Sequence, residues 1–236
     1  MSKKLAFTLA EVLIVIGIIG IVAEMIVPSL VAKTEEKIIA TQVKEVYSVL
    51  SQALKMSEIT NGTPDMWACP NIGGGDDGCG LNKFTPYLQV AKNCGMTSGC
   101  FPPVAYKKIN GSASIINFDT WPNLARARLK NGMSIAMGQS SGPSSSTSNA
   151  NNLALKNIYG EIDVDINGDK PPNRFGKDLF VFWYTKYGIV PAGTKDEDGS
   201  YPLSTDCSNK SGIGDGCAAW LIYKENMDYM NGAVSW

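Results

Sequence analysis

A long apolar segment near the N-terminus constrains this chain more than any other feature. It runs from Leu9 to Ala32, and its charged residues are Glu11 and Glu24. A helix of about 20 apolar residues crosses the hydrocarbon core of a bilayer, which is about 30 Å thick. Two lysines stand among the first four residues, so the positive-inside rule places the N-terminus in the cytoplasm. The sequence therefore predicts a single-pass membrane helix.

Two other interpretations of this segment are a cleaved secretory signal peptide and a buried helix of a soluble core. A signal peptide predicts a small-x-small cleavage site after the apolar run. This segment instead contains Glu24 and Pro28, and a helical pattern continues beyond it. The membrane helix remains the interpretation that the sequence favours.

Helical periodicity extends past the apolar segment. Apolar residues recur at helical spacing, with polar residues between them, at Val43, Val46, Tyr47, Leu50 and Leu54. The run Asn61-Gly62-Thr63-Pro64 is typical of a helix stop. We expect one helix from about Thr8 to about Glu58. Its second half should lay an apolar stripe against an extracytoplasmic head.

The residues after this helix predict an antiparallel sheet. Asn131-Gly132 separates segments 125–130 and 133–137, which is a strong hairpin signal. Further strands are expected near 158–164 and 179–184. The serine-rich run 138–152 is expected to be a loop, and residues 217–224 predict either a short helix or a last strand. A long helix packed on such a sheet is an α+β fold.

The cysteines predict structural disulfides in an oxidising compartment. All six follow the apolar segment and none has C-x-x-C spacing. Close pairs such as Cys69 with Cys79 and Cys94 with Cys100 suit short loops, but six cysteines allow about 15 pairings, so the connectivity stays open. Reduced, buried cysteines of a cytosolic protein are the alternative. The full set is Cys69, Cys79, Cys94, Cys100, Cys207 and Cys217.

The composition argues against catalysis and against nucleic-acid binding. The chain has no histidine, which removes the usual general base and every Ser-His or Cys-His nucleophile pair. The run Gly138-Gln139-Ser140-Ser141-Gly142 matches a nucleophile elbow by chance, because that motif also needs a histidine. The net charge of -1 gives no excess of basic residues for phosphate contacts. We therefore expect a protein that is not an enzyme.

An aspartate-rich loop is the one candidate metal site. Side-chain oxygens at alternate positions, followed by a glycine, resemble the first half of a calcium loop. The twelfth position is Arg174 rather than glutamate, which excludes a complete EF-hand and leaves Asp178 to close the site. The alternative is an Asn-Gly turn with solvated aspartates. The candidate calcium ligands are Asp163, Asp165, Asn167, Asp169 and Asp178.

The N-terminal segment resembles a known family at specific residues. The stretch Ala6-Phe7-Thr8-Leu9-Ala10-Glu11, followed by the apolar run to Ala23, is similar to the prepilin cleavage and methylation segment. That segment is found in type IV pilins and in the pseudopilins of type II secretion systems. The resemblance covers about a tenth of the chain.

The resemblance implies a specific processing step and a role in assembly. It places a cut by prepilin peptidase between Ala6 and Phe7, followed by methylation of Phe7, which makes Glu11 the fifth mature residue. Gly20 and Pro28 also stand at family positions. The family usually has glycine where this chain has Ala6, and an apolar residue where it has Glu24. Some major pseudopilins hold calcium in a loop of the head, which favours the calcium hypothesis.

The expected organisation follows from these points. Residues 1–6 form a leader, residues 7–32 the transmembrane half of the helix, and residues 33–236 a pilin-like head in the periplasm or in an extracellular filament. The expected partners are other pilin-like subunits, prepilin peptidase and the bacterial inner membrane, with no nucleic acid.

Two function classes fit this organisation. The first is a filament subunit, either a type II secretion pseudopilin or a minor type IV pilin used in adhesion or DNA uptake. The second is a membrane-tethered binding module or hydrolase that shares only the anchor. The Phe-Thr-Leu-x-Glu pattern favours the first class, because a plain tether does not need it.

Overall fold

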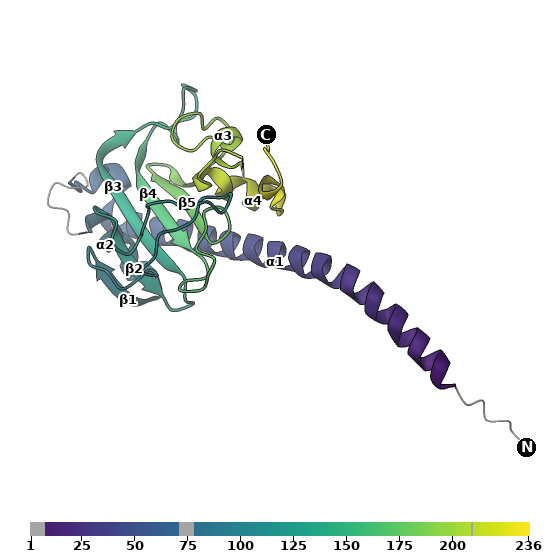
Figure 1. Cartoon of the computed structure of the whole chain (residues 1–236). Helices are drawn as coiled ribbons and strands as arrows, with labels where there is room; N and C mark the ends of the chain where they lie inside the picture. The colour runs from purple at the N-terminus through teal and green to yellow at the C-terminus, as the bar shows by residue number, and fades with distance from the viewer. Residues whose placement is uncertain (1–7, 71–77, 209) are drawn as a thin grey trace, which may run out of the picture. The chain divides into compact units, whose positions relative to one another are not determined.

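The computed structural model describes residues 8–70, 78–208 and 210–236. It divides into two compact units, Met1–Ile38 and Ile39–Trp236, and we describe each separately. The predicted cleavage site between Ala6 and Phe7 lies outside the described residues, so its processing stays a prediction. Figure 1 shows the elements in chain order.

Helix α1 extends from Leu9 to Asn61 and contributes to both units. This confirms the single long helix that the apolar periodicity predicts. The helix ends where Gly62, with φ of 75°, donates its N–H to the Glu58 carbonyl at 3.0 Å. Glycine adopts this left-handed conformation without steric cost, so it terminates helices readily. A short 3-10 helix, η1 (Pro64–Met66), follows.

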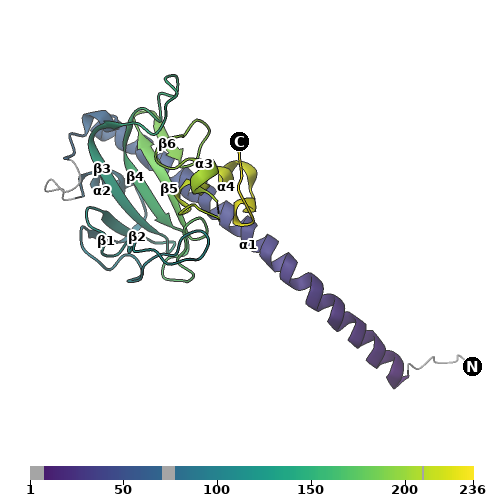
Figure 2. The same ribbon diagram turned by 45° about the horizontal axis from the view of Figure 1, so that its top comes forward.

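The second unit contains a six-stranded sheet in which every neighbouring pair is antiparallel. The strands follow one another in chain order, so the sheet is a simple meander (Figure 2). They are β1 (Val90–Gly95), β2 (Ala125–Leu129), β3 (Ser134–Ser144), β4 (Ile158–Asp165), β5 (Leu179–Thr185) and β6 (Gly188–Pro191).

The predicted hairpin is confirmed, and its second strand is longer than expected. Strands β2 and β3 pair in antiparallel register, with Ala127 opposite Ile135, and Gly132 has φ of 91°. The expectation of a loop over residues 138–152 is wrong for 138–144, because β3 continues to Ser144, and it is confirmed for 145–152. The strand extends this far because β4 supplies a partner: Gly138 and Gln139 pair with Glu161 and Gly160. Strand pairing here outweighs the low strand preference of small polar residues.

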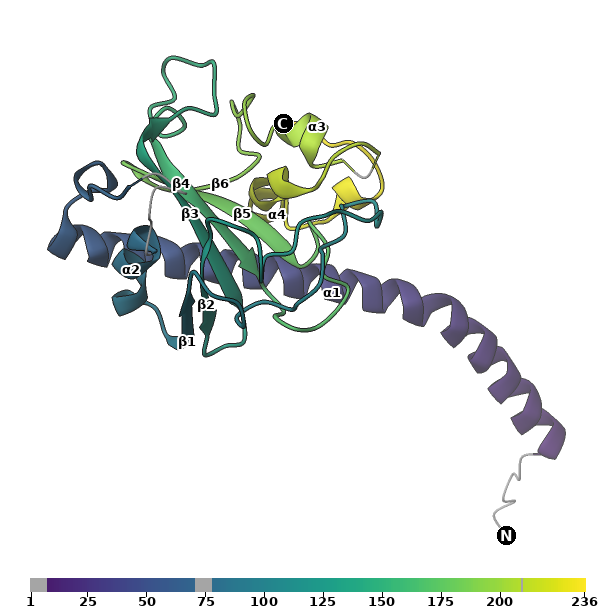
Figure 3. The same cartoon turned by 60° about the vertical axis from the view of Figure 1, so that its left-hand side comes forward.

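The second half of α1 covers one face of the sheet, which we call the inner face (Figure 3). Side chains alternate along a strand, so Ile162 and Val164 of β4 share this face with Phe180 and Phe182 of β5. The ring of Tyr47 on α1 stacks on Phe182 with centroids 6.3 Å apart. The predicted apolar stripe is therefore the core contact. Its buried members include Val43, Val46, Leu50 and Leu54.

Connecting segments cover part of the opposite, outer face, where Phe101, Tyr106 and Phe118 cluster with Ala136 of β3 and Leu179 of β5. Residues 217–224, for which helix and strand were both open, form helix α4 (Ala218–Lys224). The remaining short elements are α2 (Cys79–Phe84), η2 (Thr85–Tyr87), α3 (Leu203–Asp206), η3 (Asp215–Cys217) and η4 (Asp228–Met230).

All six cysteines form disulfides, which confirms the prediction from their number and position. The bonds join Cys69 to Cys79, Cys94 to Cys100, and Cys207 to Cys217. Each pair is consecutive in the sequence and closes a short loop.

A substitution in the stripe tests the packing of α1 on the sheet. Leu50 is 0% exposed, whereas Ile59 on the same helix is 82% exposed. Leu50→Ala should lower the free energy of unfolding by about 2–5 kcal/mol, because it leaves a cavity in the core. Ile59→Ala is the control and should change it by less than about 0.5 kcal/mol. Urea unfolding of the detergent-solubilised protein measures both. Equal effects of the two substitutions would contradict this packing.

Candidate functional site

The first half of α1 presents an uninterrupted apolar surface. Among the described residues, α1 is the one helix long and apolar enough to cross a membrane. None of the residues in its most apolar stretch is buried. The apolar side chains from Leu9 to Val31 are about half to three-quarters exposed. Burying such an area against lipid is favourable, whereas exposing it to water is costly. This half of the helix therefore needs an apolar environment from outside the chain.

Glu11 caps the N-terminus of this helix. Its Oε2 accepts hydrogen bonds from the backbone N–H and the hydroxyl of Thr8, both at 2.8 Å, and Thr8 Oγ1 accepts from the Glu11 N–H at 3.3 Å. This reciprocal pair is a capping box, which satisfies N–H groups that have no partner within the helix. The sequence pattern Thr-x-x-Glu carries the signal for this cap.

The other predicted assembly positions lie within the helix and leave its surface open. A Cβ added at Gly17 or at Gly20 would meet nothing within 4 Å, so packing inside the chain does not require glycine there. Pro28 is inside the helix, and without an N–H it cannot bond to the carbonyl of Glu24. Among the described residues, Gly17 and Gly20 gain no close contact that would offset the lower helix propensity of glycine.

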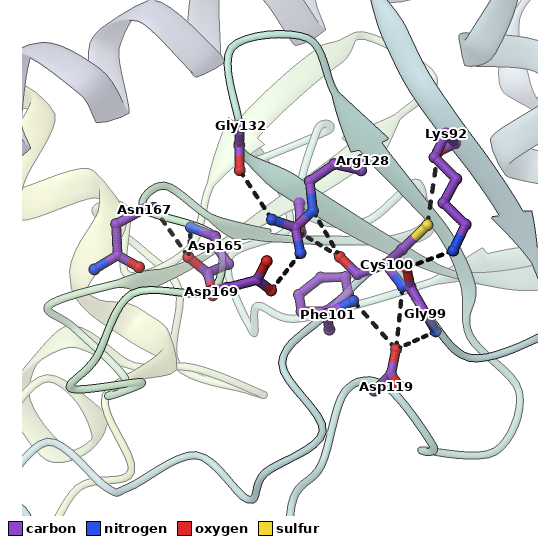
Figure 4. Close-up of polar contacts among 12 residues, drawn as sticks. Lys92, Gly99, Cys100, Phe101, Asp119, Arg128, Gly132, Asp165, Asn167 and Asp169 are labelled. Atoms are coloured by element: carbon purple, nitrogen blue, oxygen red, sulfur yellow. Dashed lines mark hydrogen bonds and ion pairs between the residues drawn. The ribbon is translucent and has the colours of Figure 1, made fainter.

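The aspartate loop is closed by its own hydrogen bonds (Figure 4). Asp165 Oδ1 accepts the N–H groups of Asn167 and Gly168 at 3.0 and 2.8 Å, and its Oδ2 accepts the Tyr106 hydroxyl. The φ of Gly168 is 66°, and a side chain there would collide with the Gly132 carbonyl. Asp165 is therefore the centre of a tight turn.

Asp178 holds the far side of the same turn. Its Oδ1 accepts from Asn167 Nδ2 at 2.7 Å, and its Oδ2 accepts from the Arg174 N–H at 2.9 Å. Burial is the main cause that raises the pKa of Asp178 to about 7 and that of Asp165 to about 6. The structure thus brings Asp165, Asn167 and Asp178 together as the sequence predicts.

The other two predicted ligands point elsewhere. The Asp169 carboxylate lies 2.6 Å from Arg128 Nη2 in an ion pair (Figure 4). Asp163 is buried in β4 beside Glu161 and Asp215 rather than in the loop. Across residues 8–70, 78–208 and 210–236, no group of three or more His, Cys, Asp or Glu side chains could hold a metal ion. Hydrogen bonds already occupy both carboxylate oxygens of Asp165 and of Asp178, which weighs against the calcium hypothesis. Among the described residues, Asn167 Oδ1 is the converging oxygen that is buried without a hydrogen-bond partner.

A second polar network, which sequence reasoning missed, holds the Cys94–Cys100 loop. Asp119 Oδ1 accepts three successive N–H groups, those of Gly99, Cys100 and Phe101, at 2.6, 3.2 and 3.1 Å (Figure 4). Arg128 Nε donates to the Cys100 carbonyl at 3.0 Å. Arg128 thereby joins the disulfide loop to Asp169 of the aspartate loop. The aspartate loop has a recognisable sequence signal, whereas the contacts of Asp119 and Arg128 with the disulfide loop have none.

The elbow-like motif has no catalytic geometry. Ser140 and Ser141 lie within β3 rather than on a strand-to-helix turn. The Ser140 hydroxyl donates to the Gly142 carbonyl at 2.8 Å. This agrees with a chance match of the pattern.

Comparison with known proteins gives a similarity to a protein family over part of the chain. Residues 29–92, from the middle of α1 into β1, match a family of unknown function (DUF6613). No curated protein and no solved structure matches the chain. The function of this chain therefore has to be inferred from its residues and its fold.

The aspartate loop yields a test of its structural role. Asp165→Ala removes an acceptor from three donors, so it should destabilise the fold by about 1–3 kcal/mol per donor left unsatisfied. Asp169→Ala removes an exposed ion pair and should cost at most about 1 kcal/mol. Calcium at millimolar concentration should leave the melting temperature of the chelator-treated wild-type protein unchanged. A calcium-dependent rise that Asp165→Ala abolishes would restore the metal hypothesis.

Proposed function

We propose that this chain is a structural subunit of a type IV pilus-like filament, namely a pseudopilin of a type II secretion system. The observation that carries the proposal is α1. The segment Phe-Thr-Leu-x-Glu leads into an exposed apolar half of the helix, and the same helix continues into a half that packs on an antiparallel sheet. In this role the exposed half holds the subunit in the inner membrane before assembly and contacts neighbouring subunits afterwards.

The disulfides support a head outside the cytoplasm. All three lie in the second unit, beyond the apolar half of α1. Structural disulfides persist in oxidising compartments such as the bacterial periplasm. With the lysines that precede the helix, they support a cytoplasmic N-terminus and a periplasmic head.

Glu11 has two separable roles under this proposal. A carboxylate within the membrane costs about 2.5–3.5 kcal/mol on insertion scales, so it needs a partner. In the single chain that partner is Thr8. In the filament it is the cationic amine of Phe7 on the next subunit, which cleavage after Ala6 creates. The capping box then holds Glu11 in place until assembly offers the stronger, charged partner.

The lack of histidine and the absence of catalytic geometry at Ser140 support a subunit that acts by assembly rather than by chemistry. The outer surface of the head then serves as a contact surface in the filament.

Processing is the first test. In a host with an active prepilin peptidase, mass spectrometry of the membrane-extracted protein should show a chain that begins with methylated Phe7. Ala6→Gly restores the residue usual in the family and should be cut equally well, whereas a bulky Ala6→Leu should block cutting. A wild-type protein that still starts at Met1 would defeat the proposal.

The charge of Glu11 is the second test. Glu11→Gln keeps an acceptor for the capping box but removes the charge, so it should leave membrane insertion intact and reduce filament assembly or secretion. Thr8→Ala removes the cap but keeps the charge, and should assemble almost normally. Membrane fractionation with a shear or secretion assay measures both. If Thr8→Ala fails and Glu11→Gln assembles, capping rather than charge is the function of Glu11.

A further inference from the structure

Acidic side chains gather on the outer face of β4, away from the aspartate loop. Glu161 and Asp163 stand two residues apart on the same face of the strand. Asp215 of η3 approaches them from the C-terminal segment, close enough to interact with both. The segment that carries Asp215 is closed by the Cys207–Cys217 disulfide. Helix η3 packs against β5, and Val181 of β5 lies opposite Asp163, so three carboxyl groups from two distant parts of the chain lie near one another on this face.

Asp163 and Asp215 are shielded from water, and Glu161 is half-buried. Asp163 is 3% exposed and Asp215 is 7% exposed. The Tyr201 hydroxyl donates to Glu161 Oε2 at 3.0 Å, and the Tyr201 ring stacks on Trp183 with centroids 5.0 Å apart. Within the part of the chain that the structure describes, Asp163 Oδ2 is buried without a hydrogen-bond partner. A charged carboxylate in that position would be very unfavourable.

A neutralising charge has to come from a basic residue, a metal ion or a proton. None of the ion pairs found among the described residues includes these three carboxyl groups. The same residues contain no group able to hold a metal ion. A proton requires no additional ligand and converts a carboxylate oxygen into a donor.

We propose that Glu161, Asp163 and Asp215 share one or more protons at neutral pH, and that these protons fasten the Cys207–Cys217 segment to the outer face of the sheet. This contact then weakens as the pH rises. The titratable groups that face the cluster are Glu161 and Asp163 from β4, Asp206 from α3, Asp215 from η3 and Tyr201 from the loop before α3.

The direction of the pH dependence follows from the bound protons. Burial is the main cause that raises the pKa of Asp163 and of Asp215 well above the usual value, and it raises the pKa of Glu161. The folded chain therefore keeps protons that the unfolded chain has released above about pH 4. Stability is full below that pH and falls as the pH rises towards the folded pKa. For each proton kept, the unfolding equilibrium constant increases about tenfold per pH unit.

The test measures urea unfolding of the full-length protein in detergent, with chelator present and disulfides intact, between about pH 5 and pH 9. Asp163→Asn removes the ionisable group but keeps its shape. Its equilibrium constant for unfolding should match or exceed that of the wild type at about pH 5, and should increase less steeply as the pH rises. Asp228→Asn alters an exposed aspartate of η4 and should run parallel to the wild type. All three proteins keep other carboxyl groups whose pKa is raised, so the stability of each still depends on pH, and the comparison is between slopes.

An Asp163→Asn curve parallel to the wild type would overturn the proposal. If Asp163→Asn does not fold, Asp215→Asn takes its place. The infrared spectrum of the wild type at pH 7 should also show a carboxylic acid C=O band that Asp215→Asn reduces, and an unchanged band would count against shared protons. Calcium that restores wild-type but not Asp163→Asn stability at high pH would show that a metal ion, not a proton, balances the cluster.

Discussion

The contact between the second half of α1 and the inner face of the sheet is the interaction on which the rest of the structure depends. Burial of apolar surface is the dominant favourable term in folding, and the largest hydrophobic cluster joins Val43, Leu50 and Leu54 of α1 to the strands. The same helix carries the exposed apolar half. Its two halves thus differ in what they are packed against rather than in secondary structure. The head stabilises a helix that would otherwise have only its own propensity.

The sequence alone was sufficient to predict those elements whose signal is local. The stop at Gly62, the Asn131-Gly132 turn and the apolar stripe of α1 each follow from one residue type at one spacing. Strands β1 and β6 were missed because they lack such a pattern. In β1 the exposed side chains include Lys92 and Asn93, and β6 is four residues long and ends in Pro191. Their conformation is set by the neighbouring strand, which a local pattern does not contain.

The candidate site also combines features that local sequence predicts with contacts that it does not predict. The turn around Gly168 was predictable, since glycine after alternating oxygen-bearing residues indicates a tight turn. The use of its oxygens was not, because Tyr106 and Arg128 come from distant segments. Asp163 illustrates the point most clearly: its spacing assigns it to the loop, but its strand buries it beside Asp215. Glu11 differs, because its Thr8 partner is local and its capping signal was present in the sequence.

The three disulfides have a consequence for how the head is made. Each joins consecutive cysteines, with separations of 10, 6 and 10 residues. A chain that enters an oxidising compartment with its N-terminus still anchored presents its cysteines one after another. Each bond can then close as soon as its second cysteine emerges, before any later cysteine competes for it. The meander has the same order, since each new strand adds beside the last. Under the proposed topology, export and correct oxidation would therefore follow the same order along the chain.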